Sequence, residues 1–484
     1  MMKNQEGSIS VFLAAVFLVF LLFISLCTEG IYLYVGKGKA MGACMAGLSH
    51  MRGNYQKELE ETYHIFGMDH RYAEKAEADL VKKIEESLEG SQDTFHFQIS
   101  TASLSDKTYL SDENGEILKY QIRELMKYEM PADILSTWKE KWDKTAASGK
   151  DVGDIREEME EDVQKAEEEA KEGEQEEENE TKQEQEDPRK GFMEMLREGS
   201  IPLVMGKRKV SSGKIPIRYG KKDTQEEETW DFMKKENVEE QLKKTEKMSS
   251  APSLADELPG ILYSTRYFHF LTSKEKKEGI QYEVEYLIAG KDSEKENLGS
   301  VLWKMIHLRF PINVLYVYQD AAKKKEAGMI ASSILGITGI PPLVAAAKHL
   351  LLLALAYGES IIDVRNLAEG NKVPLAKSKS SWQLSFQGLA GLNCTRKTSK
   401  NGLSYEDYLV LLLAMQKEKE EKYVRMMDVM EDNIRKKDAG FRMDRCLTAW
   451  KVTVPIRMKR LAFGGMSLPF GTYTSWKFQR TASY

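Results

Sequence analysis

The feature that most constrains this chain is an uncharged apolar run near its N-terminus, ISVFLAAVFLVFLLFISLCT, from Ile9 to Thr28. About 20 residues rising about 1.5 Å each match the roughly 30 Å hydrocarbon thickness of a bilayer. A buried core helix normally has a polar stripe, which this run lacks. A cleaved signal peptide is the alternative, but its apolar part usually has only about 7 to 15 residues. The run therefore predicts a transmembrane helix over residues 9–35 after a short tail over residues 1–8, with the lipid bilayer as a partner.

A stretch rich in glycine and alanine, GKGKAMGACMAGLS, follows from Gly36 to Ser49. Small side chains let helices approach closely, so this stretch either packs on its own domain or binds another membrane helix. Glu29, just before this stretch, is a further candidate for helix packing, because a carboxylate at the end of a membrane segment must reach the interface or find a partner. The candidate residues for helix packing are therefore Glu29, Gly36, Gly38, Gly42, Ala43 and Ala46.

The distribution of charge divides the rest of the chain. The 484 residues carry a net charge of -6, and the acid is concentrated between Asp151 and Asp187. A net negative charge argues against nucleic acid as a partner. The acidic segment has too few apolar residues to offset its ordering entropy, so we expect a disordered linker or insertion over residues 151–190. Residues 36–150 would then form a helical extension and the first part of a globular region, and residues 191–484 the main globular region.

Local patterns predict both helices and strands. Residues 55–88 indicate helix with a break at 66–69, and the alternation of Phe95, Phe97 and Ile99 indicates a strand. The segment QYEVEYLIA, residues 281–289, has the β-branched and aromatic residues typical of a strand. Ser293 and Glu296 stand at the spacing of a capping box, which predicts a helix over residues 297–309.

The C-terminal third has the longest helical pattern outside the N-terminal run. Residues 404–436 predict one long amphipathic helix, which begins at the capping pair Ser404 and Asp407. Alternation over residues 446–458 predicts a strand, with Pro455 placing it at an edge or a bulge, and residues 473–478 could return beside it. Together these patterns predict an α+β protein: an N-terminal transmembrane helix, then a mixed globular region with a long C-terminal helix and terminal strands.

A second hydrophobic region covers residues 329–357 and contains the pair Pro341-Pro342 and the charged Lys348. Paired prolines remove backbone hydrogen-bond donors, so two buried helices or a hairpin are favoured over a membrane span. The alternative, insertion of 329–357 as a second membrane segment, would change the topology.

The sequence has no motif that carries chemistry. The seven histidines show no HExxH spacing, no GxSxG turn is present, and the glycines around Lys37 do not match a phosphate loop. The four cysteines are scattered and allow at most one bridge, such as Cys394 to Cys446. We therefore expect no catalytic residue, metal ligand, cofactor or small-molecule substrate. The alternative is a cell-envelope enzyme whose site residues converge only in three dimensions.

Four segments in this order resemble a clostridial family of membrane proteins of unknown function, domain of unknown function fifty-seven-oh-two. They are GSISVFLAAVFLVFLLFISLCTEG, YEVEYLIAGKDSEKENL, AYGESIIDVRNLAEGNKVPLAKSKSSWQLS, and SYEDYLVLLLAMQKEKEEKYVRMMDVMEDNIR with FRMDRC. The N-terminal arrangement resembles the pilin-like proteins of tight-adherence (Flp-type) pilus loci, which keep a hydrophobic helix and expose a C-terminal domain outside the cell. The resemblance implies a structural or pilus-assembly role, with other membrane or pilus-assembly proteins as partners.

The same resemblance bears on processing and orientation. A processed prepilin would be cut after a glycine, here between Gly7 and Ser8, but this chain has Phe12 where glutamate is usual and Glu6 where a basic residue is common.

Counting positive charges on the two flanks of the helix favours a cytoplasmic domain, yet that rule is weak for a first helix before a long domain. The resemblance instead implies a cell-membrane protein of one span with its main domain outside the cytoplasm.

Overall fold

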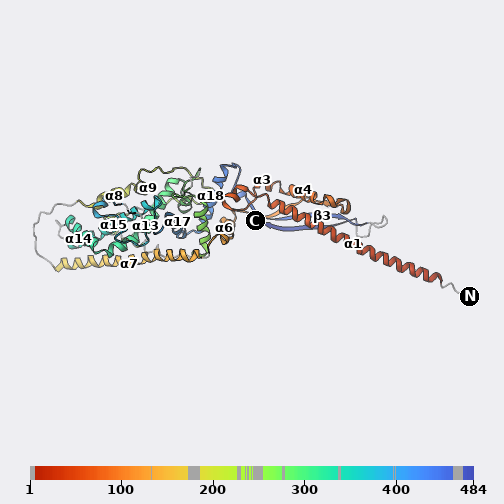
Figure 1. Ribbon diagram of the computed structural model, residues 1–484, viewed down its shortest axis with the longest axis horizontal. Coiled ribbons are helices and arrows are strands. Elements are labelled where there is room, and N and C mark those ends of the chain that lie inside the picture. Colours follow the sequence, from red (N-terminus) through yellow and green to blue (C-terminus); the bar gives the residue numbers. More distant parts are fainter. Residues whose placement is uncertain are drawn as a thin grey trace. The chain divides into compact units, whose positions relative to one another are not determined.

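A computed structural model gives the fold of the chain (Figure 1). It describes residues 6–131, 133–172, 186–225, 230–234, 236, 239–240, 243, 254–274, 278–335, 340–395, 397, 399, 401–461 and 472–484. The chain forms two compact units. Unit one combines Met1–Gln121 with Ile434–Tyr484, and unit two is Ile122–Asn433. The sequence boundaries at 150 and 190 both fall inside unit two, so the two units were not recognised from composition.

Unit one is built on the long N-terminal helix α1 (Glu6–Arg52). Figure 1 shows its first half running free of the sheet and its second half lying along helix α4 (Ala76–Leu88). Ala40, Ala43, Cys44 and Leu48 lie on one face of α1 and are buried in the core of the unit. The apolar run and the small-residue stretch thus form one continuous helix with two different surroundings.

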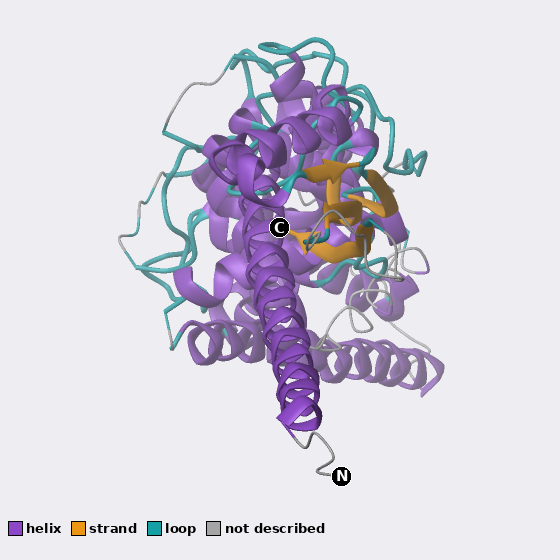
Figure 2. Cartoon of the chain, turned by 90° about the vertical axis from the view of Figure 1, so that its right-hand side faces the viewer, coloured by secondary structure: helices purple, strands orange, loops and turns teal. Residues whose placement is uncertain are grey.

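The sheet of unit one has four antiparallel strands, drawn in orange in Figure 2. The central strand is β3 (Leu447–Lys459), which pairs with β4 (Tyr473–Ser483) on one side. On its other side β3 pairs with the short strands β1 (Phe97–Ile99) and β2 (Ser103–Tyr109). The even-numbered side chains of β3 face the core, as the alternation over 446–458 predicted. The predicted return of residues 473–478 beside this strand is confirmed.

Pro455 does not mark an edge, because β3 is the central strand. The carbonyl of Pro455 accepts a hydrogen bond from the backbone N–H of Ser100, which lies in the link between β1 and β2. In an antiparallel pair the nitrogen and the carbonyl of one residue point to the same side. The missing N–H of Pro455 therefore faces the gap between the two short strands, where no ladder bond is lost.

The remaining elements of unit one are short. The predicted helix break at 66–69 is confirmed. Of the strand predicted from Phe95, Phe97 and Ile99, only β1 forms, because Phe95 lies in a helical turn. The bounds are α2 (Lys57–Tyr63), α3 (His70–Ala73), α5 (Gln92–Phe95) and η3 (Met443–Arg445), with α6 (Glu116–Glu129) crossing into unit two.

Unit two is helical in the part of the chain that the structure describes. Its centre is formed by α13 (Glu294–Gln319) and α15 (Pro341–Ala368), which pack against each other. The surrounding helices are α7 (Ile134–Glu172), α8 (Pro188–Arg197), α9 (Ser200–Met205), α11 (Leu254–Tyr267), α12 (Glu283–Ala289), α14 (Ala321–Leu335), α16 (Phe386–Leu389), α17 (Tyr405–Ala414) and α18 (Glu421–Arg435). The predicted α+β class is confirmed, with the sheet in unit one.

The expected acidic linker over 151–190 is corrected in its first part. Residues 151–172 form the second half of α7, and Ile155, Met159 and Val163 are buried. Their spacing of four residues gives an apolar stripe that acidic composition concealed. The acidic neighbour Glu158 pairs with another helix of unit two, because its Oε1 lies 2.7 Å from Nζ of Lys324 on α14. Residues 173–185 lie outside the described residues.

The predicted strand over 281–289 is wrong, because residues 283–289 form helix α12. All seven residues of this helix are buried, so its apolar run shows no face preference. A short, fully buried run cannot be assigned to strand or helix by periodicity alone. The predicted helix over 297–309 is confirmed but is longer, as α13 begins after Ser293 and continues to Gln319. The Ser293 side chain makes no capping hydrogen bond there.

The single long helix expected over 404–436 is also wrong. The chain forms α17 and then α18, and the predicted capping box of Ser404 and Asp407 is present at the start of α17. Helix α17 is apolar nearly all round and buried, whereas α18 is amphipathic. Between Met415 and Tyr423 the apolar stripe is interrupted, which is where the two helices separate.

Candidate functional site

The first half of α1 is the strongest candidate site, because its apolar surface is uncovered. The large apolar side chains between Ile9 and Leu26 are 44% to 71% exposed. Exposed apolar surface of this extent marks a membrane or protein contact, since water would make it costly. The window that qualifies as a membrane span by length and composition has none of its residues buried inside the structure.

The second apolar helix, α15, also qualifies as a membrane span by length and composition. It differs from α1, because 61% of its qualifying window is buried inside unit two. The region 329–357 forms α14 and α15, two separate helices with Pro341-Pro342 at the start of the second. Two separate helices agree with the prediction of two buried helices or a hairpin, but only α15 is largely buried, because α14 buries only Ala327, Ile330 and Ala331.

Glu29 lies where the lipid-length segment of α1 ends. It is only 6% exposed, and its Oε1 lies 3.4 Å from Nε of Arg460, which follows strand β3. One turn further, the Tyr32 hydroxyl donates hydrogen bonds to the carbonyls of Thr94 and Lys459, over 2.9 and 3.1 Å. The Tyr32 ring stacks on Phe95 with ring centres 5.0 Å apart. These contacts fix α1 to the end of the sheet that is nearest the apolar run.

Gly36 allows the next close approach of α1 to the sheet. A Cβ atom at this position would stand 2.2 Å from Sδ of Met458 and 2.9 Å from Cδ1 of Phe95. Such distances are shorter than van der Waals contact, so a side chain would force Met458 and Phe95 to move. The glycine is therefore explained by packing within unit one.

The six predicted packing residues divide between two faces of α1. Glu29, Gly36 and Ala43 face their own unit and are buried there. Gly38, Gly42 and Ala46 follow at four-residue spacing on the opposite, exposed face. No atom lies within 4 Å of a Cβ built at Gly38 or at Gly42. Only this second set is free to contact another molecule.

Gly7 and Ser8 lie in the first turn of α1, which begins at Glu6. A cut between them would leave nearly all of the helix intact. Processing at this peptide bond stays a prediction.

Unit two has a buried cluster of charged side chains, which the sequence analysis did not predict. Asp363 on α15 lies 2.9 Å from Arg309 of α13 and 2.6 Å from Nζ of Lys377. The same ammonium lies 2.6 Å from Glu359, one turn earlier on α15. All four charged groups are at most 1% exposed. Two acids four residues apart on an apolar helix were the only sequence signal for this cluster.

Burial and ion pairing act in opposite directions on the two acids of this cluster. Burial disfavours the charged form of Asp363, but Lys377 and Arg309 outweigh it and hold its pKa below the ordinary value. For Glu359 burial prevails and raises the pKa, although Lys377 opposes the change. Glu359 also accepts backbone hydrogen bonds from Gln383 and Leu384. The cluster thus binds the segment after α15 onto the helix.

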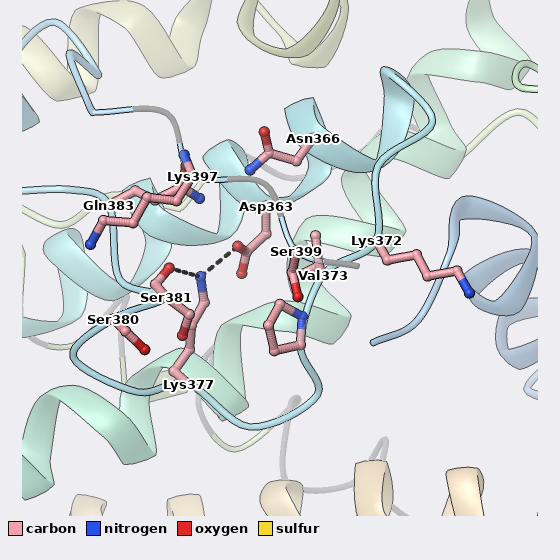
Figure 3. Close-up of a pocket in the computed structure, with 11 residues that line it drawn as sticks. Asp363, Asn366, Lys372, Val373, Lys377, Ser380, Ser381, Gln383, Lys397 and Ser399 are labelled. Atoms are coloured by element: carbon pink, nitrogen blue, oxygen red, sulfur yellow. Dashed lines mark hydrogen bonds and ion pairs between the residues drawn. The ribbon is translucent and has the colours of Figure 1, made fainter. Parts of the chain in front are cut away.

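A cavity of about 180 Å³ adjoins this cluster (Figure 3). Asp363 and Lys377 form part of its wall and are joined by a hydrogen bond in the figure. Lys397 is also in the wall, and its Nζ donates to the carbonyl of Trp382. Asp363, Lys377 and Lys397, which could serve as acids or bases, are thus engaged in binding the loop. Its other lining residues are Asn366, Lys372, Val373, Pro374, Ser380, Ser381, Gln383 and Ser399.

Among the described residues, no three His, Cys, Asp or Glu side chains form a group that could hold a metal ion. All four cysteines are free thiols, so the bridge considered between Cys394 and Cys446 is not formed. Cys446 is buried in unit one, whereas Cys394 belongs to unit two.

The fold and the site define a protein with a long exposed apolar helix, a small sheet fixed to that helix, and a helical unit. Residues 177–458, more than half of the chain, match the family of unknown function DUF5702. The chain belongs to this family. The matched region covers most of unit two together with β3, and it leaves out α1. No curated protein and no solved structure matches the chain.

Proposed function

We propose that the protein is a single-pass membrane protein whose folded units lie outside the cytoplasm and serve in the assembly of a surface structure. Helix α1 would span the bilayer through residues 9–28, and its exposed small-residue face would pack against another membrane protein. A tight-adherence pilus system is the setting that the N-terminal resemblance suggests. The proposal gives the chain a structural role and no catalytic step.

One observation carries the proposal, namely the contrast between the two halves of α1. The helix continues without a break for 47 residues, and only its second half is covered by the sheet and α4. Within the uncovered half, residues 9–28 have the length of a bilayer core and no charged side chain. Lipid covers such a surface without further protein.

The exposed face of the second half supports a protein partner. Gly38, Gly42 and Ala46 leave room for a helix to approach within backbone contact distance. Met45 and Tyr34 lie on the same side and are 46% and 81% exposed. This face begins about two turns after the apolar run, so a partner helix would emerge from the membrane beside α1.

Crosslinking in native membranes tests the partner. Gly42→Leu and Ala46→Leu place bulk on the exposed face, and we expect them to abolish crosslinks to a membrane partner while both units stay folded. Met45→Leu on the same face conserves volume and is the matched control. Undiminished crosslinking in both leucine variants would refute the packing face.

Labelling of intact cells tests the orientation. Tyr128 is 89% exposed, so Tyr128→Cys should react with a maleimide that does not cross membranes. The chain without this substitution controls for Cys27 and Cys394. Reaction only after the cells are broken would place the units in the cytoplasm.

Intact mass and N-terminal sequencing of the protein from its native membrane test the pilin-like part. A chain that begins at Ser8 would support prepilin-type processing despite Phe12 and Glu6. A chain that keeps its first residues would limit the proposal to a signal anchor.

A cell-envelope enzyme remains the second class of hypothesis. The cavity beside Asp363 and Lys377 is the place where a reaction would occur, because it combines volume with ionisable groups. Asp363, Lys377 and Lys397 hold the loop after α15, which favours a structural interpretation. Loss of a cell-envelope hydrolase activity in Ser381→Ala, with unchanged folding, would favour the enzyme instead.

A further inference from the structure

The end of the sheet in unit one lies at the level where α1 leaves the apolar run. Arg460 contacts Glu29, and the carbonyl of Lys459 accepts a hydrogen bond from Tyr32. Tyr32 lies four residues beyond Thr28, which corresponds to about 6 Å along the helix. The headgroup layer of one leaflet is about 5 to 7 Å thick. If residues 9–28 fill the hydrocarbon, this end of the sheet is therefore at the depth of the lipid headgroups.

The side chains at this end are basic and aromatic. Arg457 and Lys459 are exposed and point away from the core, because the even-numbered residues of β3 face inward. Lys459 stands opposite Tyr473 on β4, and the Tyr473 hydroxyl accepts a hydrogen bond from Gln98 on β1. Tyrosines at membrane interfaces keep their rings near the acyl chains and their hydroxyls in water. Arginine and lysine at the same depth attract anionic phosphates.

We propose that this end of the sheet, named here the basic rim and formed by Arg457, Lys459, Arg460, Tyr32 and Tyr473, binds the headgroups of anionic phospholipids. Charge complementarity selects this occupant, since Arg457 and Lys459 are exposed and positive, and the buried Glu29 beside them is paired with Arg460. The contact holds unit one against the membrane that anchors it. The inference rests on the proposed membrane insertion of α1.

The distribution of charge along β3 provides a matched control. Lys451 lies on the same strand and the same face as Lys459, but eight residues away, which corresponds to about 26 Å. Lys477 on β4 stands opposite Pro455, about 7 Å along the strand from Arg457 and about 13 Å from Lys459. Removal of these two charges changes the net charge as much as removal of Arg457 and Lys459 does. Only the change at Arg457 and Lys459 removes charges that belong to the rim.

Depth measurement on the full chain tests the proposal. Spin labels are placed at Thr94→Cys, beside Tyr32, and at Ser483→Cys, at the far end of β4, both in a Cys27→Ser, Cys394→Ser background. The two remaining cysteines are buried. The protein is reconstituted in phosphatidylcholine with and without phosphatidylglycerol. We expect the label at position 94 to meet a water-soluble relaxation agent about threefold less often than the label at 483 in the anionic bilayer.

The variants separate the possible outcomes. Arg457→Gln with Lys459→Gln should bring the label at position 94 back to aqueous accessibility, whereas Lys451→Gln with Lys477→Gln should leave it protected. Equal accessibility at 94 and 483 in both bilayers would overturn the rim, and so would protection that does not depend on the anionic lipid. A further label at Leu18→Cys reports on anchoring itself, because aqueous accessibility at this position would overturn the proposed membrane insertion as well.

Discussion

Helices α1 and α15 are both long and strongly apolar, but their surroundings differ. Both have the length and composition of a membrane span, but the qualifying window of α1 has no buried residue whereas 61% of that of α15 is buried. The charges of α15 are also satisfied, because Glu359 and Asp363 meet Lys377 and Arg309. Hydropathy identifies a helix with an apolar surface. The tertiary structure shows whether other parts of the protein cover that surface, as they do for α15.

The largest expected effect concerns the membrane insertion of α1. Leu18→Lys with Leu22→Lys places two charges near the centre of the apolar run, which should disfavour insertion by about 6 kcal/mol. We expect the chain to leave carbonate-washed membranes. Ile31→Lys with Tyr34→Lys adds the same charge beyond the run and should stay in the membrane fraction. Retention of the first variant would contradict the assignment of α1 as the anchor.

The second effect breaks the interior of α15. Asp363→Ala leaves Arg309 buried without its nearest carboxylate, and losing one partner of a buried ion pair costs about 3 to 5 kcal/mol. Amide hydrogen exchange along α15 should accelerate accordingly, while exchange in the sheet of unit one should not change. The control is Glu418→Ala, which removes an exposed ion pair with Lys221 and should cost less than about 1 kcal/mol. Equal effects of the two variants would show that the cluster is not important for stability.

A third effect comes from His349, which α15 buries. Burial lowers the pKa of His349 to about 4, from an ordinary value of 6.5. Between these two values the unfolded chain binds a proton that the folded chain does not, so the free energy of unfolding falls as the pH falls from about 6.5 to about 4. The full shift corresponds to about 3 kcal/mol. In His349→Gln this fall should be smaller, as measured by urea unfolding at several pH values.

Glu285 on α12 should show the opposite pH dependence. Burial raises the pKa of Glu285 to about 7, from an ordinary value of 4.5, so the folded chain binds more protons in this interval. The free energy of unfolding therefore falls as the pH rises from about 4.5 to about 7. In Glu285→Gln this fall should be smaller, because the substituted side chain does not titrate. An unchanged pH profile in both variants would contradict the burial of these groups.

The smallest effect compares the two faces of α1. Gly42→Ala meets no atom and adds helix propensity, so it should raise the free energy of unfolding of unit one by about 0.5 to 1 kcal/mol. Gly36→Ala would collide with Met458 and Phe95 and should lower it by about 1 to 3 kcal/mol. Hydrogen exchange in the second half of α1, measured in detergent, reports both changes. A stabilising Gly36→Ala would show that the sheet does not lie close to α1.

Several elements were readable from the sequence because their signals are local. The capping box of Ser404 and Asp407, the alternation in β3 and the pair Pro341-Pro342 each fix the backbone within a few residues. Sequence patterns do not distinguish helix from strand where burial is complete, as in α12. They also do not show an apolar stripe that is interspersed with many charges, as at Ile155 and Met159 in α7.

The candidate site was only half readable. Sequence alone identified the small residues of α1, but it gave no means of separating Gly36 from Gly38. The separation depends on Met458, which lies more than 400 residues later in the chain. The partners of Glu29 and Asp363 were hidden for the same reason, since Arg460 and Arg309 carry no signal of the acids that they meet.

The sequence by itself determined that residues 9–28 form an uncharged apolar helix of bilayer length, that the chain lacks the usual catalytic motifs, and that helices and strands are both present. These properties depend on composition and short periodicity. The tertiary structure decided that α15 is covered by protein, that residues 434–484 return to complete the sheet on α1, and that one face of α1 stays open. Such contacts join residues hundreds of positions apart, and side-chain periodicity cannot specify which distant surface will cover a given face.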